Sequence, residues 1–290
     1  MPGRLTAVLT LGTLSAALVA VAATAPQHAA AASADPRVEL GRRGVPLTAN
    51  ALVGKAATGD TETVDLMLAA GLDPNTRNEE GNAALTAATV NGQADVVQRL
   101  LAHGADPSAR DAGQHPALLL ALRTHQPANL AKLLLEAGAD PSDQDATWSP
   151  LMLASMLGDP DLVQLLLGHQ PRVDALNDRG MTALMFAAGR GHVPVMRLLV
   201  EHGAWLNAHD AGGHTALMYA ANNGQLDAVR ELLEAHAEVN VWNRNGQSAL
   251  SYARVNGHAP IVEALKAAGA LETKPAPPPR RRAPLRRRTR

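Results

Sequence analysis

The side chains that could carry out chemistry in this chain are eleven histidines and a set of evenly spaced methionines. Met152, Met185 and Met218 recur at one interval and could offer soft sulfur ligands to a metal. Neighbouring helices lie roughly 8–10 Å apart, whereas metal–sulfur bonds are near 2.3 Å. Adjacent methionines therefore cannot easily share an ion, and this column predicts packing. His192 and His258, each following a glycine, also sit at recurring positions and predict a structural role.

No motif joins these histidines to a nucleophile or to a phosphate. The sequence contains no Gly-x-Ser-x-Gly, no His-Glu-x-x-His and no phosphate-binding loop. The chain has no cysteine, which removes disulfides and thiol chemistry. We therefore predict no catalytic residue, no metal ligand and no cofactor, and we expect the protein not to be an enzyme.

The elements that must position these side chains repeat with a period of 33 residues. A leucine recurs at this interval in seven copies, and a glycine follows it seven residues later in every copy except the third, where His125 stands. A fixed period of this length is the signature of stacked repeats. The anchor leucines are Leu52, Leu85, Leu118, Leu151, Leu184, Leu217 and Leu250, and the glycines are Gly59, Gly92, Gly158, Gly191, Gly224 and Gly257.

The repeated text resembles the ankyrin repeat, whose units of 33 residues carry Thr-Pro-Leu-His near their start. Ser149-Pro150-Leu151, the Gly-His pairs and the Gly-Ala-Asp of Gly104–Asp106 match that pattern over about Leu47–Ala270. The resemblance implies an all-α ankyrin-repeat solenoid of about seven helix-turn-helix units with β-hairpin loops. The family histidine that ties a helix to the next hairpin is replaced by Thr86, Leu119, Met152, Met185, Met218 and Ser251, which puts that tie in doubt.

One unit shows how the pattern predicts its helices. Ala183–Arg190 has the composition of a short helix that Gly191 ends. Pro194 opens a second helix, where a missing N–H costs nothing. Val195, Leu198, Leu199 and His202 fall at helical spacing and predict its buried stripe. Turns with Asn first and Gly fourth, such as Asn177–Gly180 and Asn243–Gly246, lie between units.

The two ends of the chain differ from the repeats. Residues 1–34 carry Arg4, then an apolar run, then Ala32-Ser33-Ala34, which predicts a secretory signal peptide cleaved before Asp35. An uncleaved anchor is the alternative, because about 20 apolar residues can span a bilayer. Residues 35–46 read as a polar lead-in to the repeats. We expect the first and last repeats of 47–270 to act as caps, and the third to be irregular because it carries one extra residue.

Residues 271–290 form a Pro- and Arg-rich tail that we predict to be disordered. The tail holds eight of the 26 basic residues and one of the 27 acidic residues, Glu272, so the other residues carry 18 basic against 26 acidic side chains. An acidic repeat body therefore precedes a basic tail. We favour weak electrostatic contact of the tail with an anionic envelope surface; a solubilising arm or an arm docked against the acidic body is the alternative, while export argues against nucleic acid as a partner.

The remaining candidate for function is a surface. In the family that the chain resembles, partners bind the concave side, formed by hairpin tips and first helices. Trp148, Trp205 and Trp242 all fall in or beside hairpins, and tryptophan is enriched at binding hot spots; packing on neighbouring hairpins is the equal alternative. The candidate partner-binding residues are Arg77, Glu79, Glu80, Arg110, Arg123, Trp148, Asp178, Arg179, Arg190, His209, His214, Asn222, Asn223, Trp242 and Arg244.

We therefore predict a non-enzymatic, exported interaction module, monomeric and most consistent with a bacterial periplasm, that binds a protein through a rigid surface. One alternative is an accessory protein that stabilises or inhibits one exported enzyme, as an immunity protein or chaperone would. A second is a small-molecule hydrolase or metal enzyme, which a cluster of His, Asp and Ser from different columns in one pocket would favour and a solenoid with no pocket would exclude.

Overall fold

The structure is a computed structural model that describes residues 35–273. The predicted signal peptide, residues 1–34, lies outside the described residues, as does the tail from residue 274 onward. Within the described part, none of the helices is both long and apolar enough to cross a membrane.

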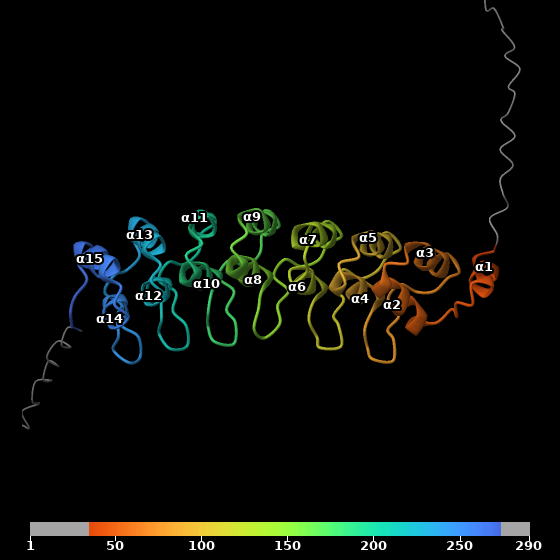
Figure 1. The fold of residues 1–290 in the computed structure, drawn as a ribbon, viewed down its shortest axis with the longest axis horizontal. Helices are drawn as coiled ribbons and strands as arrows, with labels where there is room; N and C mark the ends of the chain where they lie inside the picture. Colours follow the sequence, from red (N-terminus) through yellow and green to blue (C-terminus); the bar gives the residue numbers. More distant parts are fainter. Residues whose placement is uncertain (1–34, 274–290) are drawn as a thin grey trace, which may run out of the picture. The chain divides into compact units, whose positions relative to one another are not determined.

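Seven helix pairs stack side by side, and one further helix precedes them (Figure 1). The first helices of the pairs contact one another in one row, and the second helices contact one another in another row. The loops extend beyond the first-helix row (Figure 1). The first helices are α2 (Ala49–Thr58), α4 (Ala84–Val90), α6 (Ala117–Ala121), α8 (Pro150–Leu157), α10 (Ala183–Arg190), α12 (Ala216–Asn222) and α14 (Ala249–Val255). The second helices are α3 (Thr61–Ala69), α5 (Ala94–Ala102), α7 (Pro127–Glu136), α9 (Pro160–Gly168), α11 (Val193–Glu201), α13 (Leu226–Glu234) and α15 (Ala259–Ala267).

Short polar residues cap the start of five of the seven first helices, and glycines end several of them. The Thr182 hydroxyl accepts a hydrogen bond from Met185 N at 3.4 Å, so it caps α10 at the predicted start. Gly191 ends the same helix with a φ of 77°, in the left-handed region that glycine adopts without strain. The predicted bounds of this helix, Ala183–Arg190, are confirmed.

The anchor leucines form the spine of the core. All seven are at most 2% exposed, and the column of Met152, Met185 and Met218 is equally buried beside them, as the packing interpretation requires. The predicted stripe of α11 is partly wrong. Val195, Met196 and Leu199 are buried, whereas His202 is exposed and its Nδ1 lies 2.8 Å from the Leu198 carbonyl. Imidazole at the end of a short helix can reach that carbonyl only by turning out of the core.

A recurring contact joins one repeat to the next, and we call it the junction staple. The His192 ring lies over Gly158, the C-cap residue of α8 in the preceding repeat. Its Nε2 is 3.2 Å from the Met156 carbonyl. His258 repeats this arrangement over Gly224, with Nε2 3.1 Å from the Asn222 carbonyl. Gln93 covers Gly59 and Gln225 covers Gly191 in the same way. The structural interpretation of the Gly-His histidines is thus confirmed.

The third repeat lacks this contact on both sides. Gly92, at the end of the second repeat, has no neighbouring atom within 4 Å of the position of a Cβ. Gln126, its counterpart in the third repeat, instead lines a pocket of about 320 Å³ with Gly92 and Asn129. Asp159, which follows in the fourth repeat, caps its own helix by accepting from Leu162 N at 3.1 Å. The extra residue in this repeat and the short α6 account for the gap.

Both ends of the repeat body extend further than the sequence predicted. The lead-in contains a helix, α1 (Pro36–Arg42), whose Leu40 is buried and which packs on α3 as a second helix would. At the other end, Leu271 N donates to Asn240 Oδ1 at 2.8 Å, and Glu272 pairs with Arg254. Residues 35–46 thus contain a helix that the sequence analysis did not predict, and Leu271 and Glu272 still contact the last repeats.

The predicted hairpins are tight turns with almost no strand. Among residues 35–273 the only bridges are isolated, at Arg77 with Ala83 and at Arg110 with Pro116. The predicted turn is present, because Gly180 N donates to Asn177 O at 2.9 Å. Single backbone bonds join neighbouring tips, such as Ala211 N to Arg179 O at 2.8 Å. One bond per junction is enough to align the tips, but it is too little for a strand ladder.

Candidate functional site

The side chain two residues after each anchor leucine changes in size along the chain. The column grows from small to aromatic: Gly54, Ala87, Leu120, Leu153, Phe186, Tyr219 and Tyr252. Leu120 and Leu153 are buried, and we call the surface that the three aromatic members form with the loops the groove face. Phe186, Tyr219 and Tyr252 are each partly exposed, and each contacts a loop residue. The last three repeats thus present aromatic rings where the first two present almost no side chain.

Tyr219 ties its helix to the loop that precedes it. Its hydroxyl donates to Asp210 Oδ2 at 2.6 Å, and His214 N donates to Asp210 Oδ1 at 2.8 Å. Burial alone would raise the pKa of Asp210, but these hydrogen bonds outweigh it and lower the pKa below its usual value. Burial, and then the bond to Asp210, raise the pKa of Tyr219 above its usual value. At neutral pH an anionic acceptor therefore faces a protonated phenol.

His214 extends this network into the next repeat. Its Nδ1 lies 3.0 Å from Asp210 Oδ1, and its Nε2 lies 3.0 Å from the Tyr252 hydroxyl. That hydroxyl in turn donates to Gln247 Oε1 at 3.0 Å and accepts from Asn243 Nδ2 at 3.0 Å. Two tyrosines in a new column thus supply the helix-to-loop tie that the absent family histidine had put in doubt.

A small pocket opens beside this network. It has a volume of about 110 Å³ and is lined by His214, Met218, Tyr219, Asn222 and Tyr252. The two tyrosine rings flank the imidazole at centroid distances of 5.8 and 5.9 Å. Sites for drug-sized ligands hold about 300–1,000 Å³, so this pocket fits one amino-acid side chain of a partner rather than a whole small molecule.

The Asp210–His214–Tyr252 chain joins an acid, an imidazole and a hydroxyl from two repeats, but the hydroxyl belongs to a tyrosine and not to the serine that the enzyme alternative requires. The polar groups of this chain are also already bonded to one another within the network. Both imidazole nitrogens of His214 have partners within the network, and the Tyr252 hydroxyl has three polar neighbours. A nucleophile needs a lone pair directed at substrate, whereas this hydroxyl is directed into the loops. The network therefore accounts for positioning, and we assign it no reaction.

Trp148 and Arg123 meet at the loop before the fourth repeat. The Trp148 ring lies 4.9 Å from the Phe186 ring at a tilt of 41°, a favourable geometry for an aromatic pair. Trp148 N also donates to Asp145 Oδ1 at 2.7 Å, and Arg123 forms an ion pair with Asp145 at 3.5 Å. Half-buried Trp148 thus packs on its neighbour while still contributing to the surface.

Two of the candidate arginines are held by the loops that carry them. Arg77 Nη1 donates to Gly81 O at 2.6 Å and to Arg110 O at 2.8 Å. Arg110 Nη1 donates to Gln114 O at 2.7 Å, and its other terminal nitrogen pairs with Asp143. Burial raises the pKa of Asp143 despite this arginine. These guanidinium groups therefore fix the loops, and only their outer edges are available to a partner.

The other candidate residues are more exposed and more scattered. In residues 35–273, no hydrogen bond or ion pair engages the side chains of Asp178, Arg179, Arg190, His209, Trp242 and Arg244. Glu79 and Glu80 lie on an exposed tip, where Asn50 and Asn82 donate to them. Asn222 and Asn223 bond to each other at 2.8 Å, and Asn223 also reaches the Gly189 carbonyl. The structure brings only His214 and Asn222 together in one pocket.

Four aromatic residues of these surfaces were absent from the predicted site. Phe186, Tyr219 and Tyr252 lie on the groove face, and their signal was the growing column beside the anchor leucines. Trp205 was considered with Trp148 and Trp242 as a possible hot-spot tryptophan but was not among the candidate residues. It is 70% exposed and lines a separate open pocket of about 580 Å³ on the loop segments after the second helices.

Comparison with known proteins agrees with this architecture. The family model described as ankyrin repeats (3 copies) matches residues 52–145, 151–243 and 206–275. Among solved structures, the crystal structure of the human ASB11 ankyrin repeat domain is similar, with a TM-score of 0.64 and 25% sequence identity. The match covers 78% of this chain and 99% of that one. The search of curated proteins gave no match.

Proposed function

The chain belongs to the ankyrin-repeat family, whose repeats are protein–protein interaction modules, and we propose on that premise that it binds one partner protein through the groove face. The stacked frame holds this face in place before the partner arrives, so little conformational entropy is lost on binding. The proposal involves no covalent step, and the residues act only by contacting the partner.

The observation that carries the proposal is the run of aromatic side chains on the last repeats. Phe186, Tyr219 and Tyr252 are large, partly exposed and fixed by loop contacts. Rigid aromatic side chains beside a pocket for one side chain are the usual anatomy of an interface hot spot. Arg179, Arg190 and Arg244, which are exposed and unpaired in the described part, border this run and supply a polar rim.

The test is capture of binding proteins from an extract of the source organism with three baits. The groove variant changes Arg179, Arg190 and Arg244 to Ala and leaves the core intact. A charge-matched control changes Lys132, Arg172 and Arg230, which are exposed on second helices or the loop after one. A protein retained by the wild type and the control but lost by the groove variant supports the proposal. Equal retention by all three baits would move the interface off the groove face.

The module acts outside the cytoplasm, in a bacterial periplasm. Support comes from residues 1–34, with Arg4 before an apolar run and Ala32-Ser33-Ala34 before Asp35. The intact mass of the protein recovered from the periplasm should correspond to a chain that begins at Asp35. Recovery of the chain from Met1 in the membrane fraction would favour the uncleaved anchor instead.

A further inference from the structure

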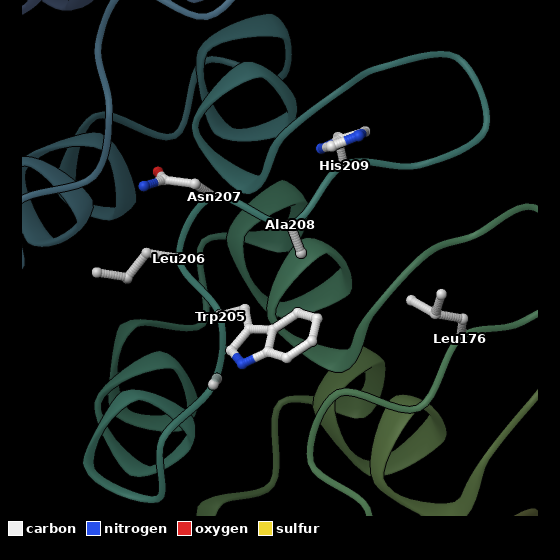
Figure 2. A pocket seen from close by; sticks show the side chains of 7 residues that line it. Leu176, Trp205, Leu206, Asn207, Ala208 and His209 are labelled. Atoms are coloured by element: carbon white, nitrogen blue, oxygen red, sulfur yellow. The ribbon is translucent and has the colours of Figure 1, made fainter.

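A second surface lies apart from the groove face, on the loop segments that follow the second helices. Trp205 is 70% exposed and Leu176, on the preceding loop, is 53% exposed. Together with Ala204, Leu206, Asn207, Ala208 and His209 they line the open pocket of about 580 Å³. Figure 2 shows the indole on the side of its loop that faces Leu176, while Leu206 points the other way. We call this surface the Trp205 pocket.

The pocket departs from the pattern of its column. The position of Trp205 is occupied by Asp73, Asp106, Asp140 and Glu238 in other repeats, each following a Gly-Ala or similar pair. An exposed indole where four other repeats place a carboxylate costs solubility without adding to the core. The backbone there is ordinary, because Trp205 N donates to Asp174 Oδ1 at 3.0 Å as Glu238 N donates to Asn207 Oδ1 at 2.8 Å. The side chain, not the fold, is what has changed.

We propose that residues 274–290 of this same chain dock on the Trp205 pocket. Leu271 occupies the column of Trp205 two repeats later, and its N–H makes the matching bond to Asn240 Oδ1 at 2.8 Å. The tail therefore leaves the repeats on the face that carries the pocket. Neighbouring helices are about 8–10 Å apart, which places the pocket roughly 20 Å back along the stack. An extended chain of 17 residues at about 3.1 Å each reaches roughly 50 Å.

Charge favours the same occupant. Residues 274–290 contain eight basic and no acidic residues. Residues 35–273 carry 17 basic and all 27 acidic residues, a net charge of −10 with histidine neutral. The Asp174 carboxylate accepts from the backbone N–H of Trp205, and the backbone N–H of Glu238 donates to Asn207, so both acidic residues adjoin residues that line the pocket. Arginine side chains of the tail can thus pair with carboxylates beside the indole.

The tail also has the chemistry that an indole surface binds. Five of its 17 residues are proline and seven are arginine. Proline-rich segments dock on aromatic grooves because little backbone entropy is lost, and guanidinium groups stack on the indole face. A covalent tether of this length supplies an effective concentration of the order of millimolar. A contact too weak to hold a separate peptide therefore suffices to hold the tail.

The test uses the indole N–H resonances in a ¹⁵N–¹H correlation spectrum, because the chain has three tryptophans. Single Trp→Phe variants assign them. Deleting residues 274–290 should shift the Trp205 resonance and leave those of Trp148 and Trp242 in place. Raising the salt concentration to about 1 M should move the full chain toward the truncated one, because screening weakens the charge pairing. An unchanged Trp205 resonance on truncation, or a salt-insensitive shift, would overturn the proposal.

Two controls separate this docking from its competitors. Leu176→Ala should reduce the effect of the tail on Trp205, whereas Leu157→Ala, at a leucine 49% exposed on α8, should not. Equal effects of the two variants would refute a role for the pocket. A Trp205 shift that grows with protein concentration over about a tenfold range would assign the tail to a second copy and overturn the intramolecular contact. These readouts do not depend on capture of a partner by the groove face.

Discussion

Substitution of Gly158 by Ala tests whether the junction staple stabilises the stack. Gly158 has a φ of 77°, and a Cβ at this residue would lie 2.4 Å from the His192 ring. Gly92 provides a matched control, because its φ is 74° and nothing lies within 4 Å of its Cβ position. Both variants strain the backbone equally, and only one disturbs a neighbour.

The expected magnitudes follow from the separate causes. A left-handed alanine costs about 1–2 kcal/mol, which is the full effect expected of Gly92→Ala. Gly158→Ala should add the loss of the hydrogen bond from His192 to the Met156 carbonyl, about 0.5–1.5 kcal/mol. The ring must also leave its packed position. We therefore expect Gly158→Ala to lower the free energy of unfolding by about 1 kcal/mol more than Gly92→Ala does.

Urea unfolding followed by far-ultraviolet circular dichroism measures this difference, with the slope checked for unchanged cooperativity. A His192→Ala background completes the cycle. There the added methyl of Gly158→Ala meets no ring, so its cost should fall to that of Gly92→Ala. Costs of the two glycine variants that agree within about 0.5 kcal/mol in the wild-type background would refute the reasoning. So would a Gly158→Ala cost that His192→Ala leaves unchanged.

Further predictions concern the aromatic residues and their network. Trp148→Ala should lower the free energy of unfolding by about 1–3 kcal/mol through lost packing, whereas Trp205→Ala, at a 70% exposed residue, should change it by less than about 0.5 kcal/mol in urea unfolding. Tyr252→Phe should lower the free energy of unfolding by about 1 kcal/mol in the same assay, because its partly buried polar partners lose their bonds to the hydroxyl. Because the pKa of Asp210 is lowered on folding, its contribution is present above its unfolded pKa of about 3.9 and is lost as the pH falls through the folded value. Tyr219→Phe should flatten the fall in melting temperature below about pH 4; a profile identical to wild type would count against this assignment.

The fold was predictable because its signals are local and repeated. The anchor leucines and the α10 bounds were confirmed, since a residue that recurs in every unit reports the same environment each time. The lead-in helix was not predicted, because it has a single buried residue, Leu40, in a short polar segment. One buried residue gives no periodic pattern from which a helix could be inferred. His202 was assigned to the core because spacing alone cannot show that its ring turns out to a carbonyl.

The candidate site was less predictable, because a surface depends on which atoms remain free. Sequence placed Arg77 and Arg110 at loop tips, but it could not show that their guanidinium groups bond to loop carbonyls. The reverse holds for Tyr219 and Tyr252. The sequence did not single them out as site residues, and only their contacts with the loops place them on the groove face. Whether the predicted residues bind a partner stays a prediction.

The missing staples around the third repeat divide the protein into two mechanical blocks. In a linear stack each repeat touches only its neighbours, and stability is a sum of repeat and junction terms. Staples tie repeats one and two together and repeats four to seven together, while the junctions beside α6 lack them. Because these two junctions lack the staple, we expect local opening of the stack to begin there. A partner bound across the junctions beside α6 would hold the two sets of repeats together, and its binding would be measured as reduced motion throughout the protein.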